Sequence, residues 1–164
     1  MRVLPTLLTG IALALALSPC LLQRAWAQQV QITRLADFSF GVLATTAGDV
    51  TQSRNVCVSA TSLGGGYSIR AIGSGGGGAF TLAGAGAPMA YDVQWAARPN
   101  QSNGLALQPG TTRGGLVSTA LGLNLGCVLG NDSASLIIAL RAADLSAATA
   151  GAYTGTLTLL VAAE

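Results

Sequence analysis

Hydrophobic and polar residues alternate at period two in several short runs of this chain. In the clearest run Met89, Tyr91, Val93 and Trp95 share one face. Alternation of this kind is the geometry of a half-buried β-strand. The other predicted strands are residues 29–35, 37–42, 56–58, 67–72, 79–83, 105–107, 116–127, 134–141 and 153–161. One segment, residues 144–150, predicts a helical turn.

Glycine-rich turns separate these runs. The longest turn spans residues 73–78, and the runs on its two sides, 67–72 and 79–83, predict a hairpin. Short strands with frequent turns and no long helix predict an all-β sandwich. A small β-barrel is the alternative, because periodicity does not distinguish the two.

The final stretch, residues 150–164, has the most informative pattern. Tyr153, Leu157, Leu159 and Val161 fall on one face, and threonines at 154, 156 and 158 fall on the other. The sequence ends three residues after Val161, so we expect no later segment to pair with the free edge of this strand. An apolar strand with an open edge is open to pairing with another chain.

The first 27 residues predict a secretory signal peptide. An apolar run follows Arg2, and the triplet Ala25-Trp26-Ala27 has small residues at its first and third positions. Cleavage is expected between Ala27 and Gln28, which leaves residues 28–164 as one domain. The alternatives are an uncleaved membrane anchor and a lipoprotein signal at Cys20.

Charge is sparse in this chain. Charged residues make up 9% of it, against a typical quarter. After loss of Arg2 and Arg24, six arginines balance six acidic residues, and the chain has no histidine. A neutral chain of this kind gives no electrostatic reason to bind nucleic acid or an anionic membrane. A surface this poor in charge is typical of a protein that works packed against others.

Cleavage would leave two cysteines, Cys57 and Cys127. Two cysteines in an exported chain predict one disulfide. Closing a loop of about 70 residues contributes on the order of 4 kcal/mol to stability.

No residue pattern predicts catalysis, a cofactor or a metal site. A serine or cysteine nucleophile has no histidine or lysine to act as its base, and the aspartates are scattered beside turns. The glycines at 73, 75 and 78 match a dinucleotide-binding pattern, but a strand follows them where that motif requires a helix. Trp95 could stack on a sugar, yet its place in an alternating strand favours a core role. The sequence therefore predicts no enzyme.

Several motifs together resemble the spore coat protein U domain family, which includes subunits of archaic chaperone–usher pili of the Csu type. The motifs are Phe38-Ser39-Phe40-Gly41, Val56-Cys57-Val58, Tyr67-Ser68-Ile69, residues 78–82, residues 91–95 and residues 150–158. The closing motif is the most specific of them.

The resemblance implies an incomplete immunoglobulin-like β-sandwich that lacks its last strand and is completed by a donor strand. It implies three kinds of partner: a periplasmic chaperone, an outer-membrane usher and other pilus subunits. It also implies export through the periplasm to the cell surface. The groove that receives the donor strand would lie beside Tyr153, Leu157, Leu159 and Val161.

The N-terminal segment leaves two possibilities open. Val30 and Ile32 fit a donor strand, but Arg34 puts a charge where a third apolar anchor is expected. Residues 28–35 are therefore either a weak donor within the fibre or the subunit's own first strand at a fibre end or adaptor position.

A tip adhesin or secreted carbohydrate-binding module is the alternative function.

Overall fold

The computed structural model describes residues 28–43, 48–62, 64–120, 127 and 130–164. Strands account for most of the regular structure. In chain order the elements are β1 (Val30–Thr33), β2 (Val50–Ala60), β3 (Gly66–Gly73), a 3-10 turn (Gly76–Gly78), β4 (Thr81–Leu82), β5 (Met89–Ala90), β6 (Asp92–Ala96), β7 (Leu105–Ala106), β8 (Thr112–Val117), β9 (Ala134–Leu140), α2 (Ala142–Ala147) and β10 (Leu157–Ala163).

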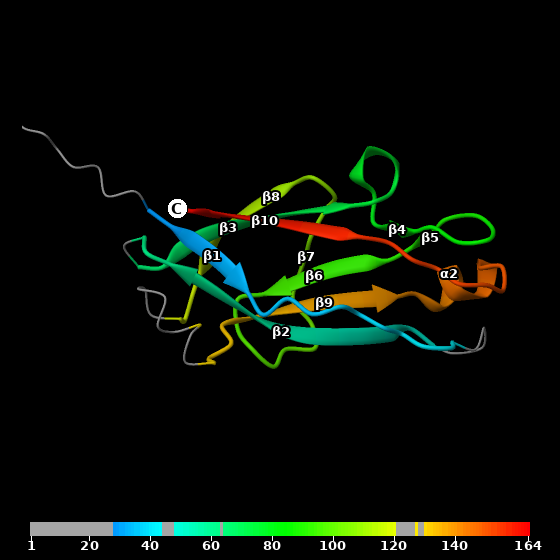
Figure 1. The fold of residues 1–164 in the computed structure, drawn as a ribbon, viewed down its shortest axis with the longest axis horizontal. Helices are drawn as coiled ribbons and strands as arrows, with labels where there is room; N and C mark the ends of the chain where they lie inside the picture. Colours follow the sequence, from blue (N-terminus) through cyan, green and yellow to red (C-terminus); the bar gives the residue numbers. More distant parts are fainter. Residues whose placement is uncertain (1–27, 44–47, 63, 121–126, 128–129) are drawn as a thin grey trace, which may run out of the picture.

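Two antiparallel sheets face each other (Figure 1). One has the order β1-β2-β9-β6-β7 and the other β10-β3-β8, with β4 and β5 forming a separate two-stranded ribbon. Neither sheet closes on itself over the described ranges, so the predicted all-β sandwich is confirmed and the barrel alternative is wrong. The orders β1-β2-β9-β6 and β10-β3 correspond to strands ABED and FC of an immunoglobulin sandwich. The position of strand G, beside β10, is taken by no strand among the described residues.

The core lies between the two sheets. The predicted inward face of residues 89–95 is confirmed, because all four of its side chains are buried. Trp95, on β6, is 1% exposed, and its indole Nε1–H donates a hydrogen bond of 2.9 Å to the Tyr67 hydroxyl oxygen on β3. This bond joins the two sheets and satisfies the polar atoms of both large aromatic side chains.

The segment 37–42 differs from the sequence prediction, because it is extended but pairs with no described strand. Its backbone is held by side chains instead: the Gln52 side-chain amide donates to the Ser39 carbonyl at 2.8 Å. Gly41 has φ +66°, which turns the chain and leaves Val42 fully exposed. The alternating phenylalanines therefore mark a segment packed through its side chains, and not a member of the β-ladder.

Three other strand predictions need correction. Strand β2 begins at Val50, six residues before the predicted strand 56–58, because residues 50–56 pair with β9. Strand β8 occupies residues 112–117 and so begins four residues before the predicted strand 116–127. The run 79–83 does not form a hairpin with β3, because β4 pairs with β5. Residues 121–126 of the predicted strand 116–127 lie outside the described residues.

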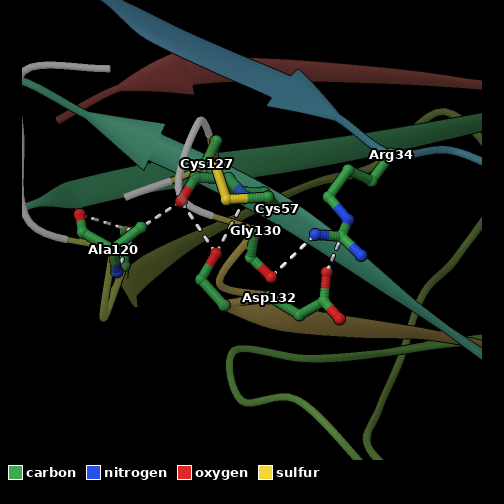
Figure 2. Close-up of a disulfide and its surroundings, with 9 residues drawn as sticks. Arg34, Cys57, Ala120, Cys127, Gly130 and Asp132 are labelled. Atoms are coloured by element: carbon green, nitrogen blue, oxygen red, sulfur yellow. Dashed lines mark hydrogen bonds and ion pairs between the residues drawn. A yellow bond between two sulfur atoms is a disulfide. The ribbon is translucent and has the colours of Figure 1, made fainter. Parts of the chain in front are cut away.

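Cys57 and Cys127 form the predicted disulfide, with their Cα atoms 5.6 Å apart (Figure 2). Cys57 is fully buried on β2. Next to it, the hydroxyl of Ser133 accepts from the Val58 N–H and donates to the Val58 carbonyl, both at 2.8 Å. Since β9 begins at Ala134, the serine supplies the bonds that a continued ladder would have made.

The disulfide is compatible with an exported protein. None of the helices in the described ranges is long and apolar enough to cross a membrane.

We expect loss of the disulfide to destabilise the fold strongly. The double substitution Cys57→Ser with Cys127→Ser should lower the free energy of unfolding by about 4 kcal/mol, because it frees a loop of 70 residues in the unfolded chain. Urea titration of both proteins under non-reducing conditions measures the difference. Equal midpoints would show that the closed loop does not contribute.

Alkaline pH should destabilise the fold through Tyr67. Burial raises the pKa of the Tyr67 hydroxyl above 10.0, and the hydrogen bond from Trp95 offsets this only in part. The folded state thus favours the neutral phenol, so stability is complete below pH 10 and falls as the pH rises through the raised pKa. Urea titrations from pH 8 to 11 should show this loss, and Tyr67→Phe should flatten it. An unchanged pH profile in that variant would assign the loss to other groups.

Candidate functional site: an open apolar groove

A cavity of about 1120 Å³ opens between the two sheets, along the start of β10 and the segment that leads into it. Its lining is apolar in character, and Asp37 is the one charged residue among the described residues that line it. The cavity has two walls and a floor, which come from different parts of the chain. The lining residues are 35–43, Leu82, Met89, Tyr91, Leu136, Ile138, Leu140, Leu145, 148–157 and Leu159.

The first wall is the extended segment 35–43. The rings of Phe38 and Phe40 stack with their centroids 6.5 Å apart, and the Arg54 guanidinium lies 5.8 Å from the Phe38 ring centre. Together with the bond from Gln52 to Ser39, these contacts attach the wall to β2. The wall therefore has a fixed position without using its own backbone in a ladder.

The second wall is β10 with the segment that leads into it. Leu157 and Leu159 point into the cavity, whereas Leu160 points away and is 48% exposed. Before β10, the backbones of Ala83 and Thr154 exchange hydrogen bonds of 2.7 and 2.8 Å. The Tyr153 hydroxyl donates to the Thr149 carbonyl at 3.0 Å. These bonds hold the approach to β10 against the ribbon of β4 and β5.

The floor belongs to β9, in the opposite sheet, together with Met89 and Tyr91 just before β6. Leu136, Ile138 and Leu140 alternate along β9 and are buried. Beside them Tyr91 stacks on Phe80, with centroids 5.7 Å apart. Burial raises the pKa of the Tyr91 hydroxyl. The floor is thus a row of large, buried apolar side chains that line the cavity.

The outer edge of β10 carries backbone groups that no described strand takes up. On its other side β10 pairs with β3 over seven residues without a register shift. The Glu164 N–H donates to the Gly66 carbonyl at 3.0 Å, which makes these two residues a bonded pair.

Bonded pairs alternate along an antiparallel ladder, so this pair fixes the direction of the other backbone groups of β10. Thr158, Leu160 and Ala162 direct their N–H groups toward β3. Leu157 and Leu159 direct theirs to the free edge beside the groove. The groove therefore offers both an apolar floor and a row of backbone donors and acceptors.

The structure brings together three of the four residues predicted for a subunit or chaperone groove. Tyr153, Leu157 and Leu159 line the cavity. Val161 faces the same side of β10 and packs against the core, but it lies outside the lining. The groove is therefore shorter at that end than the sequence pattern predicts.

The possible donor residues Val30 and Ile32 lie in β1, which pairs with β2 of the same chain. Both side chains are half-buried and pack against the core. At the predicted signal cleavage site, Gln28 is exposed and Ala27 lies outside the described residues.

The other candidate residues have structural surroundings. Trp95 is buried in the core and presents no face to a sugar. Asp92 forms an exposed ion pair of 2.6 Å with Arg141, which raises the pKa of the arginine. Asp49 accepts a hydrogen bond from the Ala142 N–H at the start of α2. Within the described ranges, no three His, Cys, Asp or Glu side chains are placed to hold a metal ion.

Sequence reasoning missed the first wall and the floor as parts of the site. The alternation in residues 134–141 does indicate an inward face, but period two does not reveal whether another layer covers that face. The phenylalanines of the first wall carry a signal too, since alternating apolar residues beside Gly41 indicate packing. Their role as a wall depends on contacts with β2 that are distant in sequence.

In comparisons with known proteins, the sequence matches no protein-family model and is similar to no curated protein.

Proposed function

We propose that this chain is a structural subunit of an extracellular fibre, built by the chaperone–usher pathway through exchange of donor strands. The observation that carries the proposal is the groove beside the free edge of β10. An extended strand from another polypeptide would pair its backbone with β10 and place alternate apolar side chains on the floor. The subunit would be structural and would need no catalytic residue.

The form of the cavity favours a strand over a compact ligand. At about 1120 Å³ it exceeds the usual range of roughly 300–1,000 Å³ for small-molecule sites. It runs along β10, where Leu157 and Leu159 repeat every second residue. A bound strand has the same repeat, and it is also the ligand that satisfies a row of backbone groups.

The likeness to the spore coat protein U family supports the same proposal. The closing motif that carries the resemblance includes Tyr153 and Leu157, and both line the groove. On this proposal the partners are a periplasmic chaperone that fills the groove first, an outer-membrane usher, and another subunit whose strand replaces the chaperone. The final location is the cell surface.

We expect a donor strand fused behind Glu164 to stabilise the chain. Joined by a short glycine-rich turn, a strand with valine at alternate positions can run back along the edge of β10. Two valines facing Leu157 and Leu159 should raise the free energy of unfolding by roughly 3–6 kcal/mol, at 1.5–3 kcal/mol for each buried side chain. Urea titration measures the gain.

The matched control is a fused strand of the same length with serine in place of valine. It should give little stabilisation, because it has no apolar side chains for the floor. Amide hydrogen exchange adds a second readout. The N–H groups of Leu157 and Leu159 should become protected only in the valine fusion, and that of Leu160 should be protected in all forms. Equal stability of the two fusions would contradict strand addition.

Substitutions of two adjacent leucines on β10 test which face of the strand contacts the donor. In the valine fusion, Leu159→Ala should remove roughly 1–2 kcal/mol of the added stability, because its side chain contacts the donor. Leu160→Ala should leave the gain unchanged, because Leu160 points to solvent. The gain is the difference between fused and unfused forms of each variant. Similar losses from both substitutions would place the donor elsewhere.

A further inference from the structure

Strand β1 is integrated into the sandwich of its own chain. Its four residues pair with residues 57–60 of β2. Ahead of the strand, the Gln29 N–H donates to the Thr61 hydroxyl at 2.8 Å, and the Thr61 N–H donates to the Gln29 carbonyl, also at 2.8 Å. The bonded part of the chain therefore begins one residue after the predicted cleavage site.

Arg34 attaches the other end of β1 (Figure 2). Its Nη1 donates to the Gly130 carbonyl at 2.7 Å, and its Nε lies 3.0 Å from a carboxylate oxygen of Asp132. The backbone of Arg34 has φ +63°, which ends the strand and turns the chain into the first wall of the groove. Gly130 and Asp132 follow Cys127, so the disulfide to β2 supports the same end.

Donation of this segment would undo these attachments. A donated β1 would leave the edge of β2 bare beside Cys57, and it would draw the first wall out of place. It would also carry Arg34 toward the groove of the accepting subunit. That groove is lined mainly by apolar side chains, with Asp37 as the one charged residue of its described lining. An arginine that does not reach this carboxylate is costly there.

We infer that this chain accepts a strand but does not donate β1. This inference rests on the proposed function and names the partner more closely. The occupant of the groove is an apolar strand from a different polypeptide, and not the N-terminal segment of a second copy. A subunit that only accepts a strand ends a fibre, because no further subunit can be joined through it.

Two peptides test this inference on the chain purified after export. One is a synthetic strand with valine and threonine at alternate positions, and the other has the sequence of residues 28–35. We expect the synthetic strand to slow exchange of the Leu157 and Leu159 N–H groups. The peptide 28–35 should leave both rates unchanged at a 100-fold higher concentration. Protection by peptide 28–35 at a concentration similar to that of the synthetic strand would overturn this inference but not the proposed function. Failure of both peptides would overturn the proposed function as well.

A cross-linked variant tests the same point without peptides. Val30 and Ala60 face each other in a pair without hydrogen bonds, so their Cα atoms lie about 4.5 Å apart. This spacing is within the range of a disulfide. Once oxidised, V30C/A60C should bind the synthetic strand with the affinity of the original chain. If the original chain forms linear oligomers and the cross-link abolishes them, the inference is overturned.

A proline substitution gives an independent check if the cross-link forms poorly. Gln31 directs its N–H toward β2, because Gln29 and Thr61 form a bonded pair two residues earlier. Gln31→Pro should lower the urea midpoint of the chain, and Gln28→Pro, outside the ladder, should not. An unchanged midpoint for Gln31→Pro would show that β1 is dispensable to its own subunit and would overturn the inference.

Discussion

The free edge of β10 above an apolar floor is the constraint on which the rest of this structure depends. Backbone N–H and C=O groups at a sheet edge need partners, and water supplies them only where it has access. Leu157 and Leu159 place the same edge beside buried leucines and isoleucines of β9. Filling the groove with apolar side chains would exclude water from the edge. A strand resolves this conflict, because it brings both apolar side chains and backbone partners.

The end of the sandwich near the disulfide shows how the chain supplies partners for unpaired backbone groups from its own side chains. Where β9 stops short of Val58, two serine hydroxyls take over the bonds of the missing ladder. Ser133 bonds both backbone groups of Val58, and Ser118 donates to the same carbonyl at 2.5 Å. The disulfide and β1 cover this region. At the groove, by contrast, no described side chain takes this role for β10.

The sequence predicts the central strands well because each has a clear inward face. Tyr67 and Ile69 on β3, and Val93 and Trp95 on β6, are the buried members of two such alternating faces. The prediction fails where the side-chain pattern does not match the backbone pairing. Phe38 and Phe40 alternate like a strand, yet the segment is held by stacking and by Gln52. Strand β8 contains two glycines and an arginine, so its pattern gives no inward face although its backbone pairs with β3.

The groove is predictable only in part for a related reason. Alternation identifies the face of residues 153–161 that turns inward, but it does not show which strand of the other sheet lies opposite. Strand β1 also contacts β10, and that contact joins segments at opposite ends of the described chain.

The other exposed edges of the sheets explain why β10 in particular suits pairing with a partner. Strand β1 has four residues and is followed by the charged Arg34, and β7 has two residues. The edge of β8 is interrupted by Gly115 at φ +71°, and its register with β3 shifts at a bulge. Short strands, bulges and charges are the features that keep sheet edges from pairing with other chains. Strand β10 has none of them: its seven residues are uncharged and in continuous register. Within the part of the chain that the structure describes, the edge that borders the groove is therefore also the edge best suited to accept a strand.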